Sequence, residues 1–212
     1  MINYYNESLK ILETLSQEKK KPRLLLHACC APCSVFPLQW LNSHFDITLY
    51  YANSNIYPSS EYEKRKEELR HYIKKFNATT SSSIQLVVPP YESDKFIQMS
   101  APLAQEPEGG KRCTMCYEMR LEDSFCYAKK CDFDYVSTVM SISRHKDSQR
   151  LNQLGLELAN KYAPVAYFTS DFKKKDGQLI AKELSKLHQL YRQDYCGCIY
   201  SLQENLRRNE KE

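Results

Sequence analysis

Cysteine is the residue type that could carry most of the chemistry in this sequence. Seven of the nine cysteines fall into three tight groups, at positions 29, 30 and 33, at 113 and 116, and at 196 and 198. Thiolates bind transition metals and take part in redox reactions. The chain opens with no apolar core of a secretion signal, and cytosolic thiols stay reduced, so structural disulfides are not expected. The grouping therefore indicates metal or redox chemistry.

Two of the groups are suited to share one metal centre. Cys113 and Cys116 are expected on the first turn of a helix, where positions i and i+3 face one side and the helix N-terminus favours thiolate. Cys29 and Cys30 follow a short apolar run, and a loop there allows both thiols to point at one multinuclear centre. Four thiolates from two segments match an iron–sulfur cluster. Zinc, which rarely uses adjacent cysteines, and thiol redox chemistry are the alternatives.

The third group, Cys196-Gly197-Cys198, has three interpretations. A disulfide across one glycine would be strained and easily reduced, which suits electron transfer. The two thiolates would also serve as ligands to a second metal, or the segment is a tight turn with two ordinary cysteines. Cys126 and Cys131 lie apart from the groups and are interpreted as small buried apolar side chains.

Strand-like and helix-like segments alternate along the chain. Strands are expected at 24–28, 47–51, 84–88, 135–140 and 165–169, and helices at 34–44, 60–76, 93–100, 113–130, 147–161 and 178–191. The pattern predicts an α/β fold, a parallel sheet with helices on both faces and ligands at the carboxyl ends of the strands. Cys29, Cys30 and Asp171 are expected at that edge. Ser60 and Glu63 predict a capping box for the second helix.

The chain length of 212 residues fits a single domain. We expect a helical lead-in at 1–22, the main domain at 23–202 and a polar tail at 203–212. The loop at 103–112 contains Gly and Pro and is interpreted as a flexible segment that could cover the site.

Charge and hydropathy narrow the class of protein only slightly. The formal net charge of +4 and the pI near 8.5 are compatible with a polyanionic partner but do not require one. No apolar run approaches the roughly 20 residues that a membrane-spanning helix needs. We therefore expect a cytoplasmic protein with no membrane partner.

Four segments together resemble the QueH-type epoxyqueuosine reductases. They are HACCAPC at 27–33, NSNIYPSSEYEKR at 53–65, RCTMCYEMRL at 112–121 and YRQDYCGCIYS at 191–201. The resemblance extends from about residue 24 to 201. It implies a Rossmann-like (HUP/PP-loop-like) fold. It also implies an iron–sulfur oxidoreductase that removes the epoxide oxygen of epoxyqueuosine at the wobble position of tRNA with a GUN-type anticodon, the last step of queuosine biosynthesis.

The resemblance also implies roles for individual residues. Cys29, Cys30, Cys113 and Cys116 would ligate a 4Fe-4S cluster. Cys196 and Cys198 would form a redox-active disulfide, and Cys33 would be a ligand to an additional iron ion. The segment DFKKKDGQ at 171–178 departs from the family, because lysines 174 and 175 stand where a proline and an aromatic residue are frequent. Substrate contacts in that segment are therefore open.

The implied reaction places further demands on the site. Converting an epoxide to an alkene takes two electrons and two protons and releases water, which requires a cofactor and an electron donor that the sequence does not identify. His27, Asp171 and Tyr195 are candidate proton donors, although each is also explained as a hydrogen-bonded structural residue. Candidates for RNA contacts, together with nearby tyrosines, are the arginines at 65, 112, 120, 144 and 192.

Two other functions fit parts of the sequence. An ATP-consuming tRNA-modifying enzyme would share the fold, but cysteines 29–33 occupy the place of a phosphate-binding loop, and the chain has only five glycines. A zinc-stabilised RNA-binding module would use its cysteines only to brace the fold. Metal content separates the second alternative from a reductase, because zinc is redox-inactive.

Overall fold

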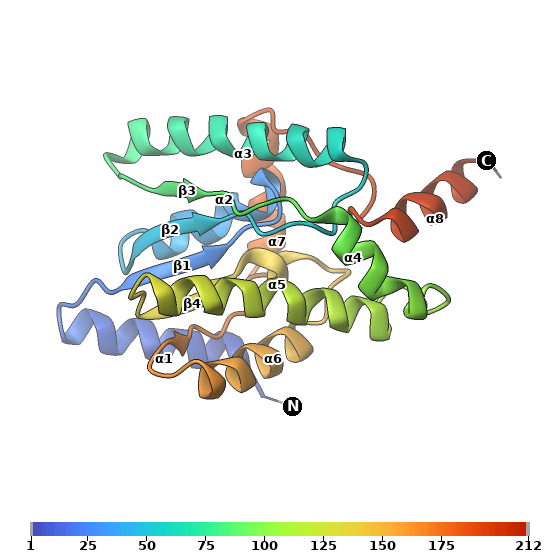
Figure 1. Cartoon of the computed structure of the whole chain (residues 1–212). Coiled ribbons are helices and arrows are strands. Elements are labelled where there is room, and N and C mark those ends of the chain that lie inside the picture. The colour runs from blue at the N-terminus through green and yellow to red at the C-terminus, as the bar shows by residue number, and fades with distance from the viewer. Residues whose placement is uncertain (1, 211–212) are drawn as a thin grey trace.

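The centre of the computed structural model, which describes residues 2–210, is a five-stranded parallel sheet (Figure 1). The strands are β1 (Arg23–His27), β2 (Asp46–Tyr50), β3 (Gln85–Val87), β4 (Tyr135–Thr138) and β5 (Ala166–Tyr167). Their spatial order is β3-β2-β1-β4-β5, with every neighbouring pair parallel. The order reverses between β1 and β4, which makes the carboxyl edge of these two strands the expected place for a ligand.

Helices cover both faces of the sheet. They are α1 (Tyr4–Gln17), α2 (Ala31–Leu41), α3 (Ser59–Thr80), α4 (Ser93–Ser100), α5 (Lys111–Lys130), α6 (Ser148–Lys161), α7 (Gly177–Leu187) and α8 (Ile199–Asn209), with 3₁₀ turns η1 (Ala101–Leu103) and η2 (Val139–Ile142). Figure 1 shows α8 projecting from the side of the molecule where α4 lies. The predicted α/β, Rossmann-like architecture is confirmed; the finer HUP/PP-loop relationship stays a prediction.

The alternation of side chains along β1 explains why two helical layers form. Leu24 and Leu26 pack into one apolar cluster with α1, α2 and α3, whereas Leu25 packs into the opposite cluster with α5 and α6. All three leucines are fully buried. A strand that is apolar on both faces must be covered on both, because successive side chains point to opposite sides.

Several predicted boundaries were wrong. The helix predicted from 60 begins at Ser59 after Pro58, and no side chain caps it, so the predicted capping box is not formed. The helix predicted to reach 191 ends at Leu187, and Gln189 takes a left-handed conformation with φ 55°. Residues 188–198 are therefore free to run as an irregular segment along the carboxyl edge.

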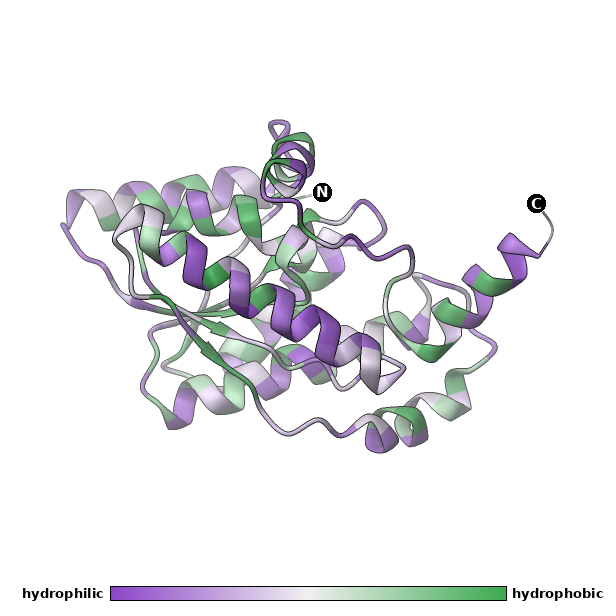
Figure 2. Cartoon of the chain, turned by 90° about the horizontal axis from the view of Figure 1, so that it is seen from above, coloured by the Kyte–Doolittle hydropathy of each residue, from purple (hydrophilic) through white to green (hydrophobic). Residues whose placement is uncertain are grey.

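The predicted polar tail is largely helical. Helix α8 runs to Asn209, and residues 211 and 212 lie outside the described residues. Figure 2 shows hydrophilic and hydrophobic residues alternating along it. None of the helices within residues 2–210 combines the length and the apolar character needed to cross a bilayer.

Candidate thiol site at the carboxyl edge of the sheet

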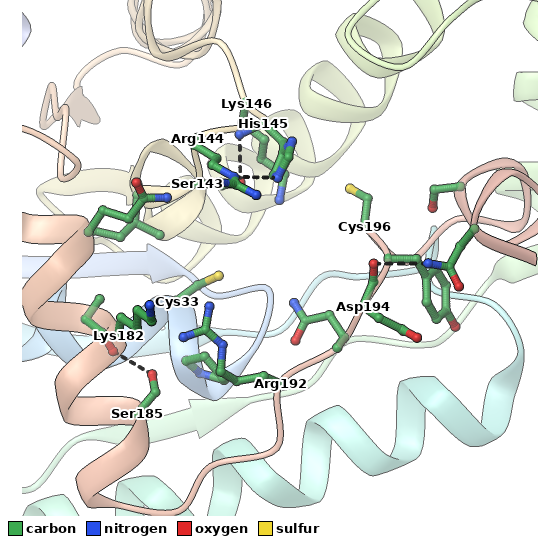
Figure 3. A pocket seen from close by; sticks show the side chains of 18 of the residues that line it. Cys33, Ser143, Arg144, His145, Lys146, Lys182, Ser185, Arg192, Asp194 and Cys196 are labelled. Atoms are coloured by element: carbon green, nitrogen blue, oxygen red, sulfur yellow. Dashed lines mark hydrogen bonds between the residues drawn. The ribbon is translucent and has the colours of Figure 1, made fainter. Parts of the chain in front are cut away.

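A cavity of about 760 Å³ lies at the carboxyl edge of the sheet. Its lining comes from the start of α2, the loop at 143–146, α7, the irregular segment at 192–196 and α8. Figure 3 shows Cys33 and Cys196 approaching this cavity from different parts of the chain. The reversal of strand order explains the location, because the chain leaves β1 toward α2 and leaves β4 toward α6 on the other face.

The first cysteine group forms a compact set of thiols. The Sγ atoms of Cys29, Cys30 and Cys33 all lie within 4.8 Å of one another, and those of Cys29 and Cys30 are 3.8 Å apart. Cys30 is the N-cap of α2, so the helix turns Cys33 back toward the two cysteines that precede it. Cys29 and Cys30 are buried and Cys33 is partly exposed to the cavity. Three thiols at this spacing can bind a metal.

The three thiols influence one another's ionisation. Hydrogen bonds from Cys30 and Cys33 hold the pKa of the Cys29 thiol well below its usual range. The hydrogen bond to Cys29 raises the pKa of Cys30 to about 12, and the same cause raises the pKa of Cys33 well above its usual range. Hydrogen bonds among the three thiols therefore favour ionisation of one member of the group over ionisation of all three.

The second group lies on the first turns of α5, as the sequence predicted. Burial raises the pKa of Cys113 and raises the pKa of Cys116 to about 12, and in both cases the nearby Cys196 and Cys198 add to the shift. The Cys113 Sγ accepts a hydrogen bond of 3.2 Å from the Gly109 N–H. Helix α5 and the segment before α8 therefore bring the second and third groups together.

Arg120 connects the second group to the first. It lies one helical turn after Cys116 and is buried, donating from Nε to His27 Nε2 at 3.3 Å and from Nη2 to Asn53 Oδ1 at 2.5 Å. Within residues 2–210 it forms no ion pair with a carboxylate. Burial lowers its pKa, but the thiols of Cys116 and Cys29 raise it above its ordinary value. The sulfur atoms of Cys116 and Cys29 therefore offset the cost of burying this guanidinium.

The candidate proton donors occupy three different environments. His27 is fully buried, and burial and Arg120 lower its pKa to about 3, so it is neutral; its Nδ1 bonds to the Thr138 hydroxyl at 2.9 Å, and its Nε2 accepts from Arg120. Asp171 is buried beside Lys173 at 3.3 Å and is not part of the cavity lining.

Of the three candidates, Tyr195 alone lines the cavity. Its hydroxyl donates to the Tyr57 carbonyl at 2.6 Å, and burial raises its pKa to about 12. The proton-donor roles of all three residues stay predictions.

Lys146 is a residue that the sequence analysis missed. It lines the cavity, and although burial lowers its pKa, the thiols of Cys196, Cys29 and Cys33 raise it above the ordinary value. An ammonium group therefore faces the thiols. The signal was available in the sequence, because Lys146 belongs to a basic run directly after the predicted fourth strand.

The arginines proposed for RNA contacts divide into two sets. Arg144 and Arg192 are exposed at the cavity, where Lys182 joins them, and none of the three pairs with a carboxylate in the described part of the chain. Three others, Arg65, Arg112 and Arg120, are buried, so their interpretation as RNA contacts was wrong. The positive charge of an arginine does not predict whether its side chain is exposed or is buried with backbone carbonyl groups as hydrogen-bond acceptors.

The structure also bears on the predictions for the isolated cysteines, the loop at 103–112 and the third cysteine group. Cys126 is exposed rather than buried, and Cys131 is partly exposed. In the loop at 103–112, Arg112 donates to the carbonyls of Leu103, Ala104 and Glu106, and the role of this loop as a flexible cover stays a prediction. Cys196 and Cys198 are not bonded to each other in the structure, where all nine cysteines lie within the described residues and are free thiols, and their redox role stays a prediction.

Comparison with known proteins identifies a family whose sequence model matches this chain. The sequence model described as "Epoxyqueuosine reductase QueH" matches residues 24–204. The chain belongs to this family. Proteins named epoxyqueuosine reductase QueH share 39% identity over 202 residues in Staphylococcus epidermidis and 37% over 200 residues in Streptococcus pyogenes serotype M1. These alignments cover 94% of this chain and 84% and 78% of the relatives.

A more distant relative has the same name. The QueH protein of Thermotoga maritima is 30% identical over 194 residues, which cover 89% of this chain and 93% of that protein. The matched range of the family contains all three cysteine groups and the residues that line most of the cavity.

Proposed function

We propose that this chain reduces epoxyqueuosine to queuosine in tRNA, through a thiol-ligated iron–sulfur cluster and a redox-active pair of cysteines. The observation that carries the proposal is that Cys33 of the first group and Cys196 of the third line one cavity, with Cys113 and Cys116 close enough to Cys196 and Cys198 to be influenced by them, in a chain of the epoxyqueuosine reductase family. The two-electron reduction removes the epoxide oxygen as water and leaves an alkene.

We propose Cys29, Cys30, Cys113 and Cys116 as the residues that hold a 4Fe-4S cluster. The donor set suits one, because within residues 2–210 the buried Arg120 has no carboxylate partner, and the cysteine sulfur atoms of Cys116 and Cys29 raise its pKa. Cys113 and Cys116 do not belong to the group of Cys29, Cys30 and Cys33, whose Sγ atoms lie within 4.8 Å of one another. A wider separation fits a multinuclear centre, because the metal–sulfide core lies between its ligands. When bound, such a cluster supplies electrons one at a time. Arg120 keeps the ligand thiolates ionised by providing positive charge between the two groups.

Cys33 has a different role in this proposal. Its thiol is close to Cys29 and Cys30 but reaches the cavity, where an additional iron ion would meet the substrate. Lys146 faces the same place, and we propose that its ammonium stabilises negative charge as it develops on the departing oxygen.

Cys196 and Cys198 would provide the reducing equivalents. Oxidation of the two thiols to a disulfide releases two electrons and two protons, which equals what the epoxide needs to become an alkene and water. An electron donor, not yet identified, would then reduce the disulfide. Tyr195, His27 and Asp171 remain the proposed groups for proton movement, with Tyr195 nearest the substrate.

The substrate would be tRNA with epoxyqueuosine in a GUN-type anticodon. Arg144, Lys182 and Arg192 line the cavity and have no carboxylate partner among residues 2–210, which suits phosphate groups on both sides of a nucleotide inserted toward the thiols. We propose that residues 23–202 form the catalytic unit, with 1–22 as a helical lead-in and 203–212 as a C-terminal appendage. A tRNA substrate agrees with the cytoplasm as the compartment.

The deciding experiment is anaerobic purification followed by assay on tRNA that contains epoxyqueuosine. We expect bound iron and acid-labile sulfide in equal amounts, broad visible absorption and conversion to queuosine. Cys126→Ser is the matched control, because Cys126 is exposed and outside the three groups, and it should keep both properties. Zinc without sulfide, together with no conversion, would contradict the proposal and favour a zinc-stabilised RNA-binding module.

A further inference from the structure

The segment at 188–198 carries both Cys196 and Cys198 but belongs to no helix or strand. Its position depends on a few hydrogen bonds to the beginning of α3 and the turn before it. The Tyr57 N–H donates to the Gly197 carbonyl at 2.8 Å, and the Tyr191 N–H donates to Glu68 Oε1 at 2.9 Å. Gln193 Nε2 donates to Cys30 Sγ at 3.4 Å, which brings the segment to the first cysteine group.

Arg65 is the residue that joins this segment to α3 most extensively. The side chain of Arg65 is 2% exposed. Its Nη1 donates to the Cys196 carbonyl at 3.1 Å, and its Nη2 lies 3.4 Å from the Tyr195 carbonyl. The two acceptors are consecutive in the chain, so one planar guanidinium orients the peptide directly before the Cys-Gly-Cys turn.

Glu61 holds the guanidinium in place. Its Oε1 accepts from Arg65 Nε at 2.7 Å, and both carboxylate oxygens are 3.2 Å from the Tyr191 hydroxyl, which donates to them. Tyr191 lies in the same segment as the cysteines, and the Arg65 guanidinium is 5.2 Å from the centre of the Tyr195 ring. Burial lowers the pKa of Arg65, but the bond with Glu61 raises it above its usual value. The network fastens three positions of the segment to one helix.

Gly197 shows how closely the turn approaches Arg65. Its φ is +132°, and a Cβ atom there would lie 3.0 Å from Arg65 Nη1. A side chain would therefore be strained and would crowd the guanidinium. On the other side of the turn, Ser201 Oγ accepts from the Gly197 N–H at 3.2 Å and lies 3.4 Å from Cys198 Sγ.

From this network we infer that Arg65 is a positioning residue that holds Cys196 and Cys198 at the cavity beside Cys113 and Cys116, rather than a contact to RNA. The importance of that position for turnover rests on the dithiol role in the proposed function. Loss of the guanidinium fork would free the two carbonyls and let the turn move away from the site. None of the proposed cluster ligands bonds to Arg65 within residues 2–210, and Cys30 contacts the segment only through Gln193 in that part of the chain.

The test is the alkylation rate of individual cysteines in the anaerobic full-length protein, followed by mass spectrometry. Arg65→Lys keeps a charge near Glu61 but cannot bond both carbonyls, and Arg65→Met removes the charge. We expect Cys196 and Cys198 to react about fivefold faster relative to Cys126 in either variant, as the loss of roughly one net hydrogen bond predicts. Cys126 is an exposed internal reference in the same sample.

Two further variants make the result decisive. Gly197→Ala displaces the same contact from the other side without removing a buried charge, and we expect the same acceleration. Arg23→Lys is the matched control, because Arg23 also donates to two carbonyls, of Cys131 and Asp132, but not to this segment. If the folded Arg65→Lys and Gly197→Ala variants left the ratio to Cys126 unchanged, Arg65 would only fill the interior and the inference would be overturned.

Kinetics separate this inference from the proposed function. Arg65→Lys should lower kcat and leave the KM for tRNA and its salt dependence unchanged, whereas an RNA contact would change KM. If Cys196→Ser and Cys198→Ser retained full turnover, the dithiol role would fail. The alkylation result would still report whether Arg65 positions the turn.

Discussion

The first and third cysteine groups are held in place by different means. Cys29 and Cys30 directly follow a central strand, are buried, and are joined to Cys33 by the first turn of α2. Cys196 and Cys198 lie in an irregular segment that side chains of α3 and the preceding turn hold in place. The first cysteine group, which follows a central strand, is suited to permanent metal ligation. The third group, which a few hydrogen bonds hold in place, is suited to a segment that changes between thiol and disulfide.

The largest effect is expected in the first cysteine group, which follows β1. Cys30→Ser should lose bound iron and reduce activity by about a thousandfold or more, because removing a central participant in catalysis has effects of that order. Iron content and conversion of epoxyqueuosine would be measured beside Cys126→Ser. Full iron content in Cys30→Ser would contradict the ligand role.

The third group should respond differently. Cys198→Ser should keep its iron and sulfide but stop after the reducing equivalents already present are used, because no disulfide can form. The measurement is product per enzyme over time, with a chemical reductant present and absent. Loss of iron from Cys198→Ser would mean that this group also ligates the metal, and the contrast between the two regions would disappear.

Arg120 tests the connection between the groups. Arg120→Met should release iron to a chelator about 10–100 times more readily, the range found when residues that support metal ligands are replaced. Arg120→Lys should lie between this variant and the wild type, because it keeps the charge and loses the bond geometry. Unchanged iron retention in both folded variants would show that the guanidinium does not support the ligands.

The smallest effects are expected at the cavity mouth. Arg192→Gln and Arg144→Gln should each weaken tRNA binding several-fold, and the slope of log affinity against log salt should fall by about 0.7–0.9 for each lost phosphate contact. Iron content should not change. Arg70→Gln on α3 is the control, because Arg70 is exposed but pairs with Glu67 away from the cavity. Equal losses in the control would mean that the charge acts nonspecifically.

Much of the fold could be predicted from the sequence, because local patterns determine it. The five apolar runs became the five strands, and the helix predicted around Cys113 begins at Lys111. The boundaries that failed depended on single residues, such as Gln189, whose left-handed conformation follows the end of α7. Helix α8 was missed because its polar composition resembles a solvent-exposed tail.

The sequence by itself determined the strand-to-helix alternation and the close spacing within each cysteine group, since neighbours at i+1 to i+3 stay together in any fold. Only the tertiary structure decided which groups meet, which arginines are interior and where Lys146 points. The physical reason is that a charged side chain is buried only if distant partners satisfy it. Arg65 meets carbonyls about 130 positions away in the chain, and Arg120 meets His27 across the sheet edge.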